Sequence, residues 1–448
     1  MEFDTTQYSS TVIQEFGFVC DWHYLGPLST SLFLLGPFLG NLIIGHMADR
    51  IGRLLTFIIN IAIFVVFGLL QAVVRNAVMF MICNFMIGIP YFGIYNQALV
   101  LLAEIVGPSK RGTVTMACVL FYAFGYSVLP AIAYYVRDWS VLVLIINLHP
   151  IIFFSYWWIL AESPRWLLSV GKVKKAKEVM QRMAKVNKVL LPDYIFESEM
   201  FETLNSKDSD LKMPIPENGT TDTFITIFRY SNTRKKTLII YYCSASITLL
   251  YYGLTFNVGN LGGNDYTNAL IAGAVEILAY SSSMYFVETQ LGRKITISVL
   301  TVIAIIATIS SAFIPQCGDT LWVMVAVYMI GKYATSAAYG VTQLYTGEIF
   351  PTTLRAIGVM SAVSLSILAS ALAPYLLTLR KIWNPLPQLV FGGLSIISAC
   401  LVLILPETRG RRLPANIQEA EIFGKKQQEP GYEIINVQDK NCVELSEV

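Results

Sequence analysis

The chain has 448 residues, of which 55% are hydrophobic and only 14% are charged, and its 32 basic and 30 acidic side chains leave a formal net charge of +2. A soluble chain of this length would need more polar surface than this composition provides. The small net charge gives no indication of a nucleic-acid partner. We therefore expect an integral membrane protein.

Apolar runs recur along the chain. About 20 helical residues span a bilayer, and eleven runs approach or exceed that length, at residues 25–45, 54–74, 78–103, 113–136, 140–160, 236–257, 268–287, 295–314, 320–344, 356–379 and 386–405. Glycines, aromatic residues and occasional prolines within them suit helices that pack against one another in lipid. Barrel strands would be shorter and strictly alternating. The sequence predicts an all-α protein with eleven transmembrane helices.

Polar stretches divide these runs into two groups. We predict an outer N-terminal segment, a five-span bundle, a cytoplasmic linker, a six-span bundle and a disordered cytoplasmic tail, over residues 1–24, 25–160, 161–235, 236–405 and 406–448. Within the linker, apolar residues at helical spacing predict an amphipathic surface helix over 172–188. The Pro- and acid-rich residues 189–222 are expected to form a mobile loop.

Lysine and arginine indicate the orientation. If the first run crosses from outside to inside, all but five of these residues lie on the inner side; the exceptions are Arg75, Arg137, Arg380 and Lys381 outside and Lys332 within a span. Inner loops of membrane proteins are enriched in these residues. We expect the N-terminus outside the cell and the C-terminus in the cytoplasm, in a protein of the plasma membrane.

One pattern occurs twice, about 240 residues apart, between apolar runs. The matching elements are Glu104 to Arg111 with Glu348 to Arg355, Glu162-Ser-Pro-Arg165 with Glu407-Thr-Arg-Gly410, and Ile-Gly-Arg53 with Leu-Gly-Arg293. Two similar membrane-embedded halves are the architecture of secondary transporters, whose substrate site lies between the halves.

The repeat leaves one span unmatched. Subtracting about 240 places the run 236–257 near residue zero, and residues 1–22 are too polar to supply its counterpart. The first half therefore lacks its first helix. Two explanations stay open: a true eleven-span form, or a truncated version of a twelve-span protein.

Specific motifs resemble a known family. Gly45 to Arg53 resembles the loop motif of the major facilitator superfamily, and Ser9 to Asp21 looks like the end of the large outer loop of the organic cation, anion and carnitine transporters, solute carrier family 22. The segments 161–168, 348–355 and 405–410 fit the same family. The resemblance covers residues 8 to 424 and implies a major facilitator fold of two pseudo-symmetric bundles. It also implies transport of small organic ions by alternating access.

The chain departs from this family at three places. Most of the large outer loop is missing together with the first helix. In the second-half loop, Thr289 and Gln290 replace the family's acidic residue and first arginine. Ile367 stands where cation carriers tend to have Asp and anion or carnitine carriers Arg, so it does not assign the substrate's charge.

Charged residues near the predicted cytoplasmic helix ends are candidates for gating ion pairs. The resemblance and the repeat together select Asp49, Arg50, Arg53, Glu104, Arg111, Glu162, Arg165, Arg293, Glu348, Arg355 and Glu407.

Two charged residues lie well inside predicted spans. Glu276 is about nine residues into its run and Lys332 about twelve, which places both in the hydrocarbon layer at 1.5 Å per residue. A charge there normally faces a cavity or a partner. Two interpretations stay open: Glu276 attracts cationic groups while Lys332 sets the charge balance, or the two form a structural ion pair.

Aromatic residues are further candidates for the substrate site. We place Tyr251 and Tyr252 at the start of the helix after the linker, and Phe92 and Tyr95 in the run 78–103. Aromatic faces attract organic cations through cation–π interactions. Ordinary packing or lipid contact is the competing interpretation.

Several other activities lack support in the sequence. It has no phosphate-binding glycine loop, catalytic triad or clustered metal ligands, so we expect no enzyme activity, cofactor or metal. Cys20 and Cys317 both map to the outer side, where two isolated residues are favoured over a disulfide. The chain ends Ser446-Glu447-Val448, which fits a PDZ ligand, although three residues often match by chance.

The predicted function is uniport or exchange of a small organic ion, cation or zwitterion first. A rival is a sugar or other neutral-solute carrier of the same fold, which a Gln-Gln pair in place of Tyr251-Tyr252 would favour. The other rival is a truncated, non-transporting membrane protein, for which the missing helix is the evidence.

Overall fold

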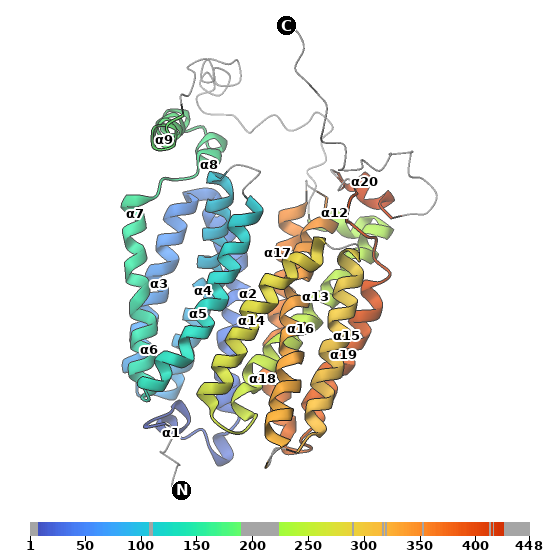
Figure 1. Cartoon of the computed structure of the whole chain (residues 1–448). Helices are drawn as coiled ribbons and strands as arrows, with labels where there is room; N and C mark the ends of the chain where they lie inside the picture. The colour runs from blue at the N-terminus through green and yellow to red at the C-terminus, as the bar shows by residue number, and fades with distance from the viewer. Residues whose placement is uncertain are drawn as a thin grey trace.

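The computed structural model describes residues 8–106, 111–189, 224–288, 291–315, 318, 320–351, 354–411, 414 and 416–424. The sequence predictions for Thr289, Gln290, Cys317, the chain end Ser446 to Val448 and nearly all of the loop 189–222 concern residues outside this description. The described residues form two groups of long, roughly parallel helices that stand side by side (Figure 1).

The first group has five helical spans. They are α2 (Leu25–Ile51), α3 (Arg53–Val73), α4 (Ala77–Ile105), α5 (Arg111–Tyr135), and a broken span of α6 (Trp139–Leu148), a 3-10 turn (His149–Ser155) and α7 (Tyr156–Ile159). The break lies at Pro150, because proline lacks the N–H that an α-helix needs. The sequence predicted a single uninterrupted transmembrane helix over residues 140–160.

The second group has six helical spans. They are α13 (Ser231–Asn257), α14 (Asp265–Glu288), α15 (Gly292–Phe313), α16 (Thr320–Ile349), α17 (Arg355–Ser370) continued by α18 (Ala373–Thr378), and α19 (Leu386–Val402). Ten of the eleven predicted spans form helices long and apolar enough to cross a membrane. The eleventh, α19, is apolar but has 17 residues.

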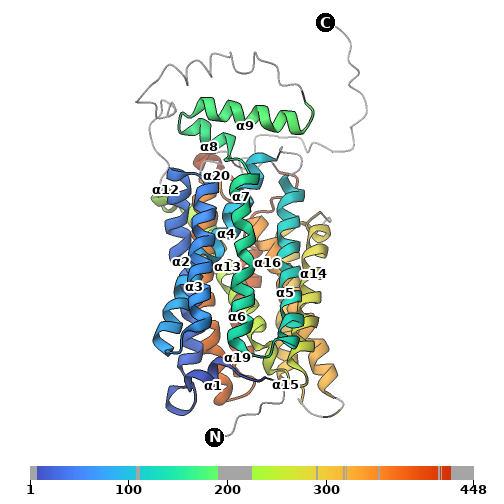
Figure 2. The ribbon, with the colours of Figure 1, turned by 90° about the vertical axis from the view of Figure 1, so that its left-hand side faces the viewer.

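Short helices mark the two ends of the bundle. The end with α1 (Val12–Phe16) is called the α1 end here. At the opposite end, called the α9 end, lie α8 (Pro164–Ser169), α9 (Val173–Val186), α12 (Phe224–Arg229) and α20 (Ile417–Ile422). Figure 2 shows α9 lying across the long helices, which confirms the predicted amphipathic helix.

The start of the tail is ordered, which corrects the prediction of disorder from residue 406. Lys236 of α13 donates hydrogen bonds from Nζ to the carbonyl oxygens of Ala420 at 2.8 Å and Phe423 at 2.5 Å. The Glu421 carboxylate accepts the backbone N–H groups of Asn232 and Thr233. The polar composition of the tail gave no sign of these contacts. Through them α20 caps the exposed start of α13.

Small residues let helices approach closely. At Gly273, in α14, an added Cβ would lie 2.5 Å from Ser127 Oγ of α5, so the two halves are in direct contact there. The halves meet again where Ser31 of α2 donates a hydrogen bond to the Ala371 carbonyl oxygen at 2.6 Å. In the second half, α13 packs between α16, α17 and α19.

Candidate functional site

A buried ion pair lies midway along the second half. Lys332 Nζ of α16 is 2.6 Å from Glu276 Oε1 of α14, and both side chains are fully buried. Glu276 is in the middle of α14 and Lys332 is in the middle of α16, far from both helix ends. Charges at such a depth persist where they are paired or face a polar cavity.

A threonine fixes the position of the ammonium group. Lys332 Nζ donates a hydrogen bond to Thr255 Oγ1 at 2.5 Å, and Thr255 in turn donates to the Tyr251 carbonyl oxygen at 2.7 Å. Because the hydroxyl proton is already engaged, a lone pair of Oγ1 is available to the lysine.

Aromatic rings surround the same ammonium group. Lys332 Nζ lies 4.0 Å from the ring centroid of Tyr251 and 5.7 Å from that of Tyr126. Tyr251 stacks on Tyr339 with 5.2 Å between centroids and meets Tyr252 edge-on at 5.4 Å. Tyr126 belongs to α5, so the first half contributes one ring to a site whose charged groups come from the second.

The carboxylate has unused hydrogen-bonding capacity. Glu276 Oε2 is buried and accepts no hydrogen bond from the described residues. A buried carboxylate oxygen of this kind is costly unless a further donor or cation reaches it. The arrangement thus combines a carboxylate and aromatic faces, which is the chemistry that recognises organic cations.

The other predicted substrate residues are more dispersed. Phe92 of α4 packs edge-on against Tyr91, which in turn meets Phe33 of α2, and Tyr95 is half-buried on α4. Ile367 is buried in α17. Tyr251 and Tyr252 lie near the end of α13, which corrects their predicted place at its start.

Charged residues at the α9 end of the first half form a compact network. Arg53 pairs with Asp49 at 2.9 Å and with Glu104 at 3.6 Å. The Glu162 carboxylate accepts the backbone N–H groups of Arg53 and Leu54, which caps the start of α3.

The second half repeats this arrangement. Arg293 pairs with Glu348 at 3.3 Å, and the Glu407 carboxylate accepts the backbone N–H groups of Arg293 and Lys294. Thr408 adds a hydrogen bond to Glu348 at 2.5 Å. Arg53, Glu104 and Glu162 of the first network thus correspond to Arg293, Glu348 and Glu407 of the second, as the sequence repeat predicts. The Arg53–Asp49 pair is specific to the first half among the described residues.

Three of the predicted gating residues whose side chains are described, Arg50, Arg165 and Arg355, are not in these pairs. Arg355 donates from Nε to the Phe350 carbonyl oxygen at 3.5 Å, and Glu348 pairs with Arg293 instead. Arg50 and Arg165 are exposed. Arg111 begins α5, and its side chain lies outside the description.

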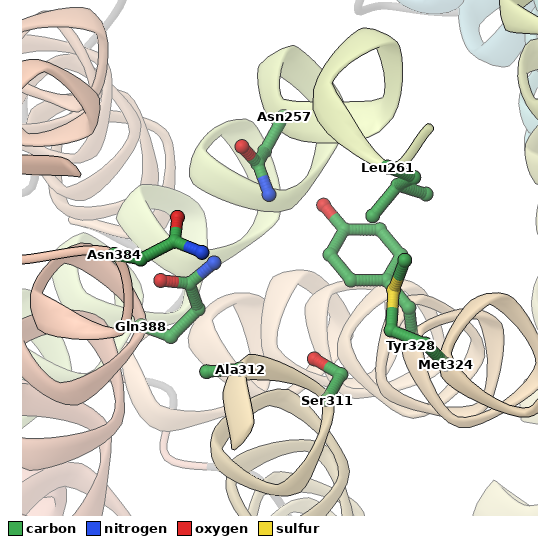
Figure 3. A pocket seen from close by; sticks show the side chains of 8 residues that line it. All are labelled: Asn257, Leu261, Ser311, Ala312, Met324, Tyr328, Asn384 and Gln388. Atoms are coloured by element: carbon green, nitrogen blue, oxygen red, sulfur yellow. The ribbon is translucent and has the colours of Figure 1, made fainter. Parts of the chain in front are cut away.

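A separate small pocket lies between α13, α15, α16 and α19, one helical turn from Lys332 toward the α1 end. Its empty volume is about 260 Å³ including the open mouth, and Figure 3 shows its lining of Asn257, Leu261, Ser311, Ala312, Met324, Tyr328, Asn384 and Gln388. Tyr328 donates a hydrogen bond to the Leu254 carbonyl oxygen at 2.5 Å and so separates this pocket from the ion pair.

Sequence reasoning missed three members of the site. Thr255 is one turn from Tyr251 on α13, and Tyr339 is two turns from Lys332 on α16, so helical spacing could have selected both. Tyr126 gave no such signal, because only the packing of the two halves brings it to Lys332.

Comparison with known proteins identifies the class. Residues 7–418 match the family model "Sugar (and other) transporter". In structure the chain resembles the xylose transporter of E. coli in its partially occluded inward-open conformation, with a TM-score of 0.68, 17% identity and coverage of 87% of this chain and 89% of the other. The protein is a multi-pass transporter of the major facilitator fold, and this is a family of transporters rather than of enzymes.

Sequence relatives narrow the family. The chain is 35% identical over 424 residues to the "Organic cation transporter protein" of Drosophila melanogaster, covering 95% of this chain and 76% of the relative. It is 31% identical to the human "Organic cation/carnitine transporter 2", covering 93% and 73%. The chain belongs to the organic cation and carnitine transporter family, solute carrier family 22.

Proposed function

We propose that this protein carries small organic cations across the membrane by alternating access, as a uniporter or exchanger. The observation that supports this most is the buried Glu276 carboxylate, which has one oxygen without a hydrogen bond and lies beside the aromatic ring that faces Lys332. A carboxylate supplies the charge and the rings supply the cation–π surface. The names of the relatives support the same substrate class.

The cycle would place substrate between the two bundles, with Glu276 as its main anchor and Tyr251, Tyr252 and Tyr126 around it. Phe92, Tyr95 and Ile367 would line the path farther from the charge. The Arg53 and Arg293 networks would hold the helix ends at the α9 end and rearrange as that end opens and closes.

We also propose an orientation, in which the α9 end faces the cytoplasm and the α1 end faces the exterior of the plasma membrane. The excess of lysine and arginine at the α9 end supports this. A tag at Met1 should be accessible on intact cells, and a tag at Asn218 only after permeabilisation. Access to Asn218 on intact cells would reverse the orientation.

The chain end offers a further proposed contact. Ser446-Glu447-Val448 has the pattern of a ligand that adds a strand to a PDZ sheet. A tail peptide should lose binding to a PDZ domain when Val448 is replaced by Asp. Equal binding by the two peptides would remove this proposal.

The transport proposal is tested by uptake of labelled tetraethylammonium into vesicles that contain the full chain. Glu276→Gln removes the anchor charge and should lower uptake at least about tenfold, equivalent to roughly 1.4 kcal/mol. Glu178→Gln, the same change at an exposed position on α9, serves as the matched control and should transport normally.

Three results would count against this proposal. If Glu276→Gln took up as much cation as the unmodified protein, Glu276 would not be part of the substrate site. Loss of uptake together with surface expression would favour a purely structural ion pair. Saturable uptake of a labelled sugar, with none of the cation, would favour the neutral-solute rival.

A further inference from the structure

The position of Lys332 has a chemical meaning beyond charge balance. Its ammonium group sits 2.6 Å from a carboxylate oxygen of Glu276 and 4.0 Å above the centroid of the Tyr251 ring. Those are the groups that an organic cation would use in this site. The protein's own side chain therefore occupies the place of the ligand.

We propose that Lys332 is a tethered stand-in for the transported cation. It fills the cation site when the carrier is empty, the substrate displaces it from Glu276, and it returns when the substrate leaves. This inference rests on the proposed cation transport and deepens it, because it assigns the competitor that substrate must overcome.

The surroundings of the ammonium group support a reversible role. One flexible four-carbon stem carries it. Among the described residues, the neutral hydrogen bond of the ammonium group goes to Thr255 and holds it beside the carboxylate. The ring of Tyr126 lies 5.7 Å away on the side of the first half. A displaced ammonium would move toward this second aromatic face rather than into an apolar wall.

A stand-in also explains how an empty carrier could close. Without Lys332, the empty site would hold a lone carboxylate in the membrane interior, which is a costly state. With Lys332 in place the pair is neutral, and the empty carrier can reorient. The substrate-bound carrier then differs from the empty one by the charge of the substrate.

Equilibrium binding gives the sharpest test, because the sign of the effect is diagnostic. We would titrate the purified full chain in lipid nanodiscs with tetraethylammonium. Lys332→Gln removes the competitor and should tighten binding at least about tenfold. Lys332→Arg keeps a competing cation and should bind like the unmodified protein. Glu276→Gln should bind tetraethylammonium weakly, whether residue 332 is Lys, Gln or Arg.

Lys236→Gln is the matched control. Like Lys332, Lys236 is buried. It donates a hydrogen bond to a carbonyl oxygen at the α9 end, away from the site. Its substitution should leave the affinity for tetraethylammonium unchanged.

Thr255→Val provides a milder variant in case Lys332→Gln does not fold. It removes the hydrogen bond that holds the ammonium in place, so it should also tighten cation binding, by about threefold. Weaker or equal binding in both variants would overturn the proposal, because a lysine that merely supports the site would not oppose the ligand. If no variant and no unmodified protein bound the cation, the proposed function itself would fail.

Flux measurements give a second readout. In Lys332→Gln, net uptake into vesicles without internal substrate should fall at least about tenfold, because the empty carrier must return with an unpaired carboxylate. Exchange against internal tetraethylammonium avoids the empty state and should fall far less. Equal losses of net uptake and exchange would contradict the stand-in role.

Discussion

The two halves of the molecule repeat one another in sequence but differ in how well their helices are enclosed. In the second half, 72% of the most apolar stretch of the α13 span is buried within the protein. In the first half the figure is 11% for α5 and 11% for the α6–α7 span, against 50% for α17–α18, the repeat equivalent of α5. The central helix of the second half thus has no counterpart among the described residues of the first.

The exposed side chains show where that counterpart would pack. Phe121 and Tyr135 of α5 and Trp158 of α7 are each about three-quarters exposed or more. Lipid can cover such residues. In the second half the repeat equivalent of α5, α17–α18, packs against α13, although Leu365, the equivalent of Phe121, is also exposed. The two halves therefore share the charged networks at the α9 end. They differ at the centre, where α13 of the second half has no counterpart among the described residues of the first.

The charge that we assign to substrate binding follows the same asymmetry. Glu276 and Lys332 both belong to the second half, whereas the corresponding interior of the first half presents aromatic residues such as Tyr126 and buried amides such as Asn60. The better enclosed half holds the buried charges, because a rigid surrounding is needed to keep a carboxylate and an ammonium paired in the membrane.

The largest effect should come from filling the first half. An apolar helix of about 21 residues, fused ahead of Met1 or co-expressed, would cover α5 and α6–α7. We expect surface yield and cation uptake to rise at least about tenfold, because the added helix would enclose both spans. A soluble linker of the same length is the control. Unchanged surface yield and uptake on addition of the apolar helix would contradict this packing interpretation.

The capping carboxylates should show that the two halves are equivalent at the α9 end. Glu162→Ala and Glu407→Ala each remove the carboxylate that accepts the first two backbone N–H groups at the start of α3 or α15. We expect each to lower the free energy of unfolding by about 2 kcal/mol, measured by thermal unfolding in detergent, with Glu178→Ala as control. A large loss for one and none for the other would break the equivalence.

Part of this picture was predictable from the sequence, for physical reasons. Span positions follow from hydropathy, and the members of the two charged networks could be selected because their motifs recur in both halves of the sequence. Glu276 and Lys332 stood out because buried charge is rare in membranes. Their mutual contact and the ring of Tyr126 depend on packing between α5, α14 and α16, which no local pattern records.

The error on the tail has a physical origin. The tail was judged by its polarity, yet Glu421 and the carbonyl of Ala420 bind the start of α13, so a long-range partner ordered it. Hydropathy likewise gave no sign that Arg293 of α15 pairs with Glu348 of α16, because that contact also depends on packing between helices.

A smaller effect should appear where the halves touch at the α1 end. Tyr8 Oη donates a hydrogen bond to Asp265 Oδ2 at 2.7 Å, and burial together with that bond raises the pKa of Tyr8, so the phenol remains a donor. A double-mutant cycle of Tyr8→Phe and Asp265→Asn should give a coupling of about 1 kcal/mol in thermal unfolding. Additive effects would mean that this contact does not join the halves.

The smallest expected effect is a pH dependence within the first half. The hydrogen bond from Ser10 lowers the pKa of Asp138, with further bonds from the backbone of Val141 and Ser140 and opposition from burial. Because the folded pKa is depressed, this stabilisation is present above the ordinary carboxyl pKa and is lost as pH falls through the folded value. Between pH 5 and pH 3, both rough limits of this window, the unmodified protein should lose more thermal stability than Asp138→Asn. Parallel losses would contradict the assignment.

The most direct test of the account is the structure of the protein with bound tetraethylammonium. We predict density for the cation beside the Glu276 carboxylate and within about 6 Å of the Tyr251 ring centroid, with Lys332 Nζ moved away from its present 2.6 Å contact. Density in the first half instead, among Phe33, Tyr91 and Phe92, with the Glu276–Lys332 pair intact, would contradict the central claim that the second half holds the cation site.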